Sequence, residues 1–163
     1  NGTKEHHQWV AEHLDRSYIP MLKKSPRIIQ KNIEGHSILM THYHIQPSKL
    51  SDPICLDPFS KIVEPSLHHI ASLFKEYEAR LILFGHHHPV HYFKNERTIY
   101  LNPGSLGCSH QETAPYAIVE ITPDELKIDL QEAVYDKTSF IASYERLKVP
   151  DRYFILKVFH GTD

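Results

Sequence analysis

The chain has 163 residues, enough for one domain that buries about two-thirds of its unfolded surface. Hydrophobic residues make up 40% of it and charged residues 23%, as in ordinary soluble globular proteins, and a net charge of −2 excludes a strong basic field for nucleic acid. No apolar run approaches the ~20 residues that span a bilayer. Two cysteines are too few for a disulfide framework, which favours a cytoplasmic location.

The first third of the chain predicts a helix, a hairpin and a long loop. Apolar spacing after Thr3, a candidate N-cap, predicts a helix to about Arg16. Arg27–Ile33 and His36–Thr41 are β-rich runs separated by Glu34-Gly35, which predicts a hairpin. Residues 45–64 contain three prolines and predict a loop long enough to be functional or mobile.

The rest of the chain alternates helical and strand patterns. A helix with Pro65 in its first turn is followed by Leu81–Phe84, an apolar run typical of a strand covered on both faces. Further strands are predicted over Thr98–Leu101, Tyr116–Thr122 and Leu126–Val134. Two closing helices are predicted after Thr138 and after Asp151, the second one stopped by Gly161. This order predicts an α/β fold, a sandwich built on a mixed sheet.

Three segments place unusual residues directly after apolar strands. They are His42, Gly85-His86-His87-His88, and Asn102-Pro103-Gly104-Ser105. In open α/β sheets, ligands bind at the carboxyl ends of the strands. The three segments are therefore candidates for one common site.

The histidine segments suit a metal. In extended backbone, His86 and His88 project to the same side and can reach two adjacent ions, while Gly85 lets the backbone turn closely beneath a ligand. The alternative is a solvent-facing, histidine-rich turn. His42 taken alone favours a buried histidine bonded to a backbone carbonyl over a ligand. The segment Asn102–Ser105 is primarily a turn signal, with a phosphate cradle as the alternative.

Together, in this order and spacing, the three segments resemble the calcineurin-like metallophosphoesterases, and among them the YfcE-type phosphodiesterases. The resemblance implies that residues 1–163 form the C-terminal part of a single domain. It also implies the C-terminal half of a four-layer phosphatase fold, closed by two C-terminal helices. The implied activity is hydrolysis of phosphomonoesters or phosphodiesters by a metal-activated water, on a small or nucleotide-like substrate.

The resemblance also implies a metal site. His42 and His86 would bind one divalent ion and His88 a second, with Mn expected first and Fe, Zn, Ni or Co as alternatives. Asn102, Gly104 and Ser105 would shape the loop beside the phosphate. Tyr43 stands where many relatives have glycine and would crowd the approach. His44 is interpreted as an exposed loop histidine, with a place near the phosphate as the alternative.

The family pattern also contains Asp-x-His, Gly-Asp-x-x-Asp and Gly-Asn-His motifs, none of which occurs in this chain. Three imidazoles cannot complete two metal sites, so we expect a missing N-terminal segment and little activity from this chain alone. That segment, or a second copy in a homo-oligomer, is expected to cover the exposed sheet. Two alternatives are a non-catalytic scaffold that keeps the fold and a metal store at pairs such as His6-His7.

Overall fold

The computed structural model describes residues 2–162, and the side chains of residues 4–162. The chain divides into two compact units. We call Pro26–Ser105 with Pro115–Gln131 the sheet unit. The helical unit contains residues 2–25, Leu106–Ala114 and residues 132–162.

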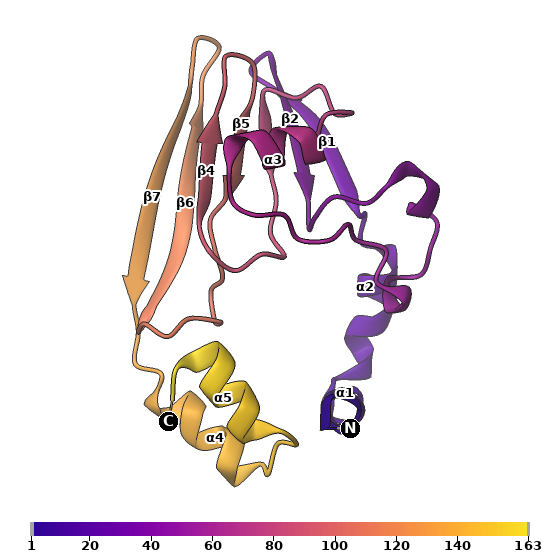
Figure 1. The fold of residues 1–163 in the computed structure, drawn as a ribbon, viewed down its shortest axis with the longest axis vertical. Helices are drawn as coiled ribbons and strands as arrows, with labels where there is room; N and C mark the ends of the chain where they lie inside the picture. Colours follow the sequence, from indigo (N-terminus) through magenta and orange to yellow (C-terminus); the bar gives the residue numbers. More distant parts are fainter. Residues whose placement is uncertain (1, 163) are drawn as a thin grey trace. The chain divides into compact units, whose positions relative to one another are not determined.

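A five-stranded mixed sheet forms the centre of the sheet unit (Figure 1). Its strands, in the order β1-β2-β3-β5-β4, are β1 (Ile28–Ile33), β2 (His36–Thr41), β3 (Leu81–Leu83), β5 (Ile99–Asn102) and β4 (His91–Lys94). The three central strands β2, β3 and β5 are parallel, whereas β1 and β4 pair antiparallel at the two edges. The carboxyl ends of the parallel strands therefore meet at one edge of the sheet.

The predicted hairpin between β1 and β2 is confirmed. Ile33 faces His36 across the ladder, so the connecting turn is the two-residue segment Glu34-Gly35. Both residues have positive φ, 49° and 82°, as a type I′ turn requires. The two-residue turn thus fixes the register in which β1 and β2 pair.

Alternate residues of the sheet enter two separate cores. One face packs against α3 (Leu67–Leu73) and the residues after it, through Leu39 and Ile82 of the sheet and Ile70 of the helix. The other face packs against a long hairpin of β6 (Thr113–Ile121) and β7 (Leu126–Val134), through residues such as Ile38 and Leu81. The unit therefore has three layers: helix, mixed sheet and two-stranded sheet. This confirms the mixed α/β class.

Two local expectations in this unit were wrong. Pro65 is not in the first turn of α3, because the helix begins after Ser66, whose Oγ accepts a hydrogen bond from the His69 N–H at 3.2 Å. Strand β4 was not predicted, since it has only four residues and owes its place to pairing with β5.

The long segment between β2 and α3 is ordered by contacts between its ends. It contains two short 3-10 helices, η2 (Pro47–Lys49) and η3 (Ile54–Leu56). Ile45 and Phe59 form an antiparallel bridge, and the Ser60 N–H donates to the His44 carbonyl at 2.9 Å. The bridge returns the chain to the carboxyl end of β2.

The helical unit contains α1 (Gly2–His13), η1 (Arg16–Tyr18), α2 (Ile19–Lys24), α4 (Thr138–Arg146) and α5 (Arg152–His160). Thr3 lies inside α1 rather than before it, and α2, which has Pro20 in its first turn, was not predicted. The two closing helices are confirmed, as is the stop at Gly161, which has a φ of 67°. None of the helices in residues 2–162 combines the length and apolar character needed to cross a bilayer.

The core assignment predicts a contrast between two leucines. Leu81 is completely buried between the two sheets, whereas Leu56 in η3 is 69% exposed. Leu81→Ala should lower the free energy of unfolding by about 2–5 kcal/mol, because it leaves a cavity in the core. The matched Leu56→Ala should change it by no more than about 0.5 kcal/mol. Urea unfolding of both variants tests this, and equal effects would contradict the assignment.

Candidate metal-binding site

His42 and His86 come together at the carboxyl ends of the adjacent parallel strands β2 and β3. Nε2 of His42 lies 3.1 Å from Nδ1 of His86, although the residues are 44 apart in the sequence. The Gly85 N–H donates to the His42 carbonyl at 2.8 Å. This bond continues the hydrogen bonding between β2 and β3 beyond the last pair of their ladder, Met40 and Leu83. A Cβ at Gly85 would meet its nearest atom, the His42 carbonyl oxygen, at 3.5 Å, so protein atoms alone do not require glycine there.

The backbone turns sharply at His86. This residue has a φ of 69°, and the His87 N–H donates to the Gly85 carbonyl at 2.8 Å, which closes a three-residue turn. The expectation that His86 and His88 project to one side from extended backbone is therefore wrong. A positive φ is unfavourable for a residue with a side chain, and such strain is found most often at functional sites.

Aromatic rings surround the histidine pair. The ring centroid of Phe59 lies 5.1 Å from that of His42 and 5.2 Å from that of His86, and Tyr43 lies 5.2 Å from His86. Desolvation, with a smaller contribution from the neighbouring His86, lowers the pKa of His42 below its ordinary value. This shift favours the neutral imidazole of His42, the form that binds a metal.

The spacing of the two nitrogens fits one metal ion. Two imidazoles on a tetrahedral ion, with metal–nitrogen distances of 2.0–2.1 Å, have their nitrogens about 3.3 Å apart, close to the 3.1 Å observed. Within residues 2–162, however, no three His, Cys, Asp or Glu side chains are grouped as a complete site would need. His42 and His86 can thus supply two ligands. The role of His88, which is exposed, stays a prediction.

A second histidine pair connects this loop to strand β4. Nδ1 of His87 lies 3.1 Å from Nε2 of His91, which belongs to β4 and is 1% exposed. His91 faces Asn102 across the β4–β5 ladder. The Asn102 side-chain amide, also fully buried, donates to the carbonyl oxygens of His87 and Pro89. Asn102 therefore holds the histidine loop in place, while its contact with a phosphate stays a prediction.

Gly104 lies where only a glycine fits. Its φ is 94°, and a Cβ there would come within 2.8 Å of Pro115 Cγ, 3.1 Å of Val90 Cγ2 and 3.3 Å of the His88 carbonyl oxygen. Its N–H donates to Oδ1 of Asn102 at 3.0 Å. The turn Asn102–Ser105 thus packs directly against the histidine loop, as the common site predicted from the sequence requires. Ser105 is partly buried, and its role stays a prediction.

Two interpretations of neighbouring residues are corrected. Tyr43 does not project into the approach to the site, because its side chain is 1% exposed and belongs to the core. His44 is not an exposed loop histidine. It is 6% exposed, with Nδ1 at 2.7 Å from Oγ of Ser60 and Nε2 paired with the carboxylate of Glu76.

Sequence reasoning missed His91 and Phe59. The aromatic pair Tyr92-Phe93 after His91 was the available signal for a strand. No local signal pointed to Phe59, because only the bridge to Ile45 brings its ring to the histidine pair.

Comparisons with known proteins give the family and the fold of this chain. The family model described as the calcineurin-like phosphoesterase superfamily domain matches residues 10–124. A hypothetical protein from Pyrococcus horikoshii OT3 has a similar fold, with a TM-score of 0.68 and 19% identity over 93% of this chain. A metallophosphoesterase from Sphaerobacter thermophilus gives a TM-score of 0.67 and 17% identity over 95% of this chain. At these identities the likeness shows the fold alone.

The chain spans only part of these two proteins. It covers 57% of the Pyrococcus chain and 65% of the Sphaerobacter chain. No curated protein matches it. The family match confirms the resemblance found in the sequence, and the two structures confirm the fold.

A matched pair of glycine variants tests the packing of the Asn102–Ser105 turn. Gly35 also has positive φ but has no atom within 4 Å of its Cβ position. Gly35→Ala should cost about 1–2 kcal/mol of unfolding free energy for the backbone alone. Gly104→Ala should cost about 1–3 kcal/mol more, because its methyl group also clashes with Pro115 and Val90. Equal losses in urea unfolding would show that the turn can move away from the histidine loop.

His91 predicts a pH dependence of stability. Burial, and to a smaller extent His87, lower the pKa of His91 in the folded state. As the pH falls below the unfolded-state value of 6.5, the unfolded chain binds a proton that the folded chain resists, so stability falls. His91→Phe should reduce the slope of unfolding free energy against pH, between 6.5 and 5, by up to about 1.4 kcal/mol per pH unit.

The control for this experiment is His68→Phe, which replaces an exposed histidine. The His68 variant should keep the wild-type slope. A His91→Phe protein with the same slope as wild type would mean that His91 takes up its proton without cost in the folded state.

Proposed function

The chain belongs to the calcineurin-like phosphoesterase superfamily, and from this premise we propose that it forms part of a metal-dependent phosphoesterase. One observation carries the proposal. The ring nitrogens of His42 and His86 converge to 3.1 Å at the carboxyl ends of two parallel strands. A non-catalytic scaffold has no physical need for two imidazoles held at ligand spacing.

The residues of the chain divide the work of binding and positioning. His42 and His86 hold one divalent ion through Nε2 and Nδ1. His88 binds a second, with Mn as the first expectation and Fe, Zn, Ni or Co as alternatives. When bound, such ions make a water molecule nucleophilic at neutral pH and neutralise charge on the phosphoryl oxygens. Asn102 keeps the histidine loop in position, and Gly104 and Ser105 shape the edge that faces a phosphate.

The site needs ligands beyond this chain segment. Two imidazoles leave at least two positions of a tetrahedral ion open, and no third ligand joins them within residues 2–162. We propose that the remaining ligands, carboxylates among them, come from a further segment of the protein or from a second copy of it. The part of the Pyrococcus and Sphaerobacter chains that this chain does not cover leaves room for such a segment. The proposed substrate is a small phosphomonoester or phosphodiester, including nucleotide-like ones.

Metal binding and activity are tested on the full-length protein. We expect His86→Ala to weaken Mn²⁺ binding, measured by calorimetry, by at least about 100-fold, since it removes a direct ligand. In hydrolysis of bis-p-nitrophenyl phosphate with Mn²⁺, His86→Ala and His88→Ala should each abolish most of the activity. His68→Ala, an exposed histidine of α3, is the matched control and should behave like the wild type.

The two readouts separate the parts of the proposal. Unchanged metal affinity in His86→Ala would refute the assignment of the ion to the histidine pair. An unchanged rate in His88→Ala would refute the second assignment alone. Residues 1–163 on their own should show little or no turnover, and a high rate would mean that this segment carries a complete site.

A further inference from the structure

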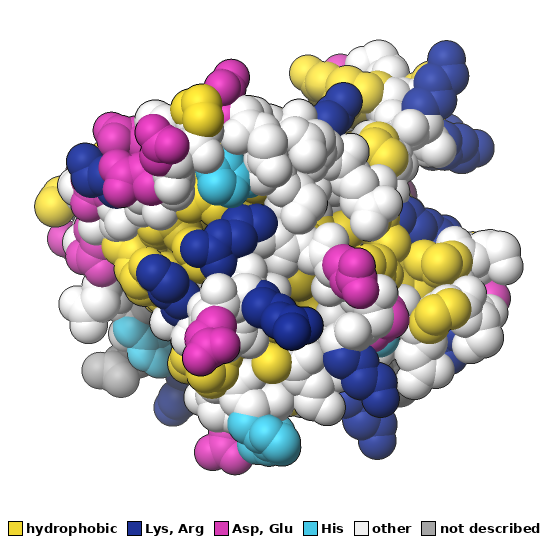
Figure 2. All heavy atoms as spheres, turned by 90° about the horizontal axis from the view of Figure 1, so that it is seen from above, with side chains coloured by type: hydrophobic (Ala, Val, Ile, Leu, Met, Phe, Trp, Pro, Cys, Tyr) yellow, Lys and Arg dark blue, Asp and Glu magenta, His cyan; other side chains and the backbone are white. Residues whose placement is uncertain are grey.

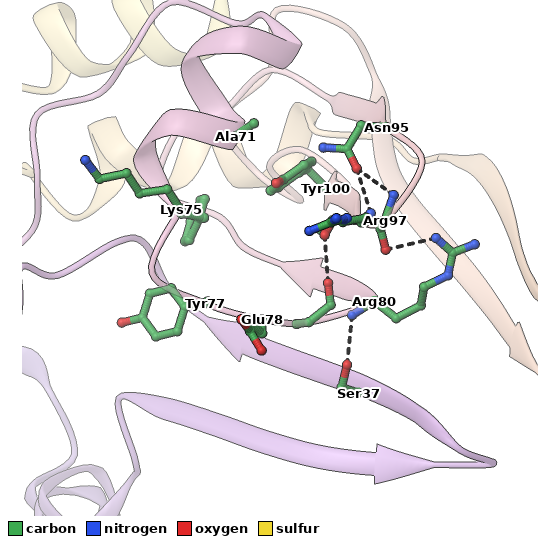
Figure 3. Close-up of a pocket in the computed structure, with 12 residues that line it drawn as sticks. Ser37, Ala71, Lys75, Tyr77, Glu78, Arg80, Asn95, Arg97 and Tyr100 are labelled. Carbon is green, nitrogen blue, oxygen red and sulfur yellow. Dashed lines mark hydrogen bonds between the residues drawn. The ribbon is translucent and has the colours of Figure 1, made fainter.

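The sheet unit contains a second concave site, at the end of the strands opposite to the histidines. A cavity of about 660 Å³ lies where β2, β3 and β5 begin, lined there by Ser37, Arg80 and Thr98 (Figure 3). Its volume is within the roughly 300–1,000 Å³ typical of small-molecule sites. Arg80 and Gly85 are five positions apart in the sequence, roughly 16 Å along an extended chain. A small molecule bound here would not touch the histidine pair.

The cavity has an apolar aromatic floor. Phe74 and Tyr100 line it and are almost fully buried, and Tyr77 is half-buried beside them. Ala71 of α3 and Ala79 complete this surface with small side chains. Of the three rings, Tyr77 offers exposed surface, so an apolar body would pack against Tyr77 and the two alanines, above the buried rings.

The charged side chains around this floor are mainly cationic. Lys75, Arg80 and Arg97 line the cavity, against one carboxylate, that of Glu78, so the lining carries an excess of two positive charges. Figure 2 looks onto this end of the molecule and shows Lys and Arg side chains gathered around apolar ones in the middle of the face. None of the three cations forms an ion pair with a residue in 2–162.

Arg80 is fixed in place without a counter-charge. Its guanidinium, half-buried, donates to the carbonyl oxygens of Arg97 at 2.9 Å and Glu96 at 3.3 Å. These bonds hold the turn before β5, in which the Asn95 side chain accepts from the N–H groups of Arg97 and Thr98. The positive charge therefore stands pre-oriented at the cavity, and the Arg97 guanidinium forms no hydrogen bond with the described part of the chain, residues 2–162. A partly buried cation with no anionic partner is stabilised by binding one.

We propose that this cavity binds a small organic anion with a planar apolar body. The body would lie against Tyr77, Ala71 and Ala79, and the anionic group, a phosphate or a carboxylate, would accept hydrogen bonds from Arg97. Figure 3 shows Arg97 on the turn before β5 close to Tyr100, whereas the Lys75 side chain, from just beyond α3, points away from them and adds positive charge at the rim. The site is separate from the proposed phosphoesterase centre and stands or falls independently of it.

Amide chemical shifts of the ¹⁵N-labelled protein, titrated with phenyl phosphate and with benzoate in the presence of EDTA, test this site. Both should shift the signals of Arg80, Thr98 and Tyr100 in a saturable manner. Benzyl alcohol, which has the ring without the charge, should not. The anion that binds with the higher affinity then shows whether the site prefers a phosphate or a carboxylate.

Variants make the outcome decisive. Arg97→Gln should weaken binding about tenfold or more, because it removes a charge-assisted hydrogen bond and no bond that holds the fold. Lys94→Gln, a nearby exposed cation of β4 outside the cavity, should bind like the wild type, and so should His86→Ala. The proposal is overturned by an absence of shifts at millimolar anion, by shifts confined to the histidine loop, or by equal affinity in Arg97→Gln and wild type.

Discussion

The parallel pairing of β2, β3 and β5 is the constraint on which the rest of this structure depends. In the observed register, Met40 pairs with Leu83 and Leu83 with Leu101, so the three strands end together. The residues that follow them, far apart in the chain, are thereby delivered to one edge. The same register sends alternate side chains into the two cores on either face. Site and stability therefore depend on the same hydrogen-bonded ladder.

The histidine pair is held in place by the turns and side chains around it. A strained turn at His86 directs its ring toward His42. The buried amide of Asn102 fixes the carbonyl groups of the same loop, and the missing side chain of Gly104 lets the next turn approach it. A strained backbone conformation of this kind persists only where the surrounding contacts hold it in place. The loop is thus held in one conformation by the protein itself.

The two ends of the central strands present opposite chemistry. At the carboxyl ends, desolvation lowers the pKa of His42, which favours the neutral imidazole that can bind a metal cation. At the amino ends, Arg80 and its neighbours leave positive charge without an ionic partner, which suits an anion. Within residues 2–162, no three His, Cys, Asp or Glu side chains are grouped as a complete metal site would need, and the chain spans 57% and 65% of the two related chains.

The sequence alone determined the features that depend on neighbouring residues. Glu34-Gly35 specified the hairpin, the apolar run at Leu81 specified a buried strand, and Gly161 ended the last helix. It also singled out three segments that the structure brings together at one edge of the sheet. Only the tertiary structure decided which groups meet. The pairing of His42 with His86, the burial of His44 against Glu76, and the support of His87 by His91 all join distant elements. No local pattern encodes them, because a side chain's partner is set by strand register and loop closure rather than by its neighbours in sequence.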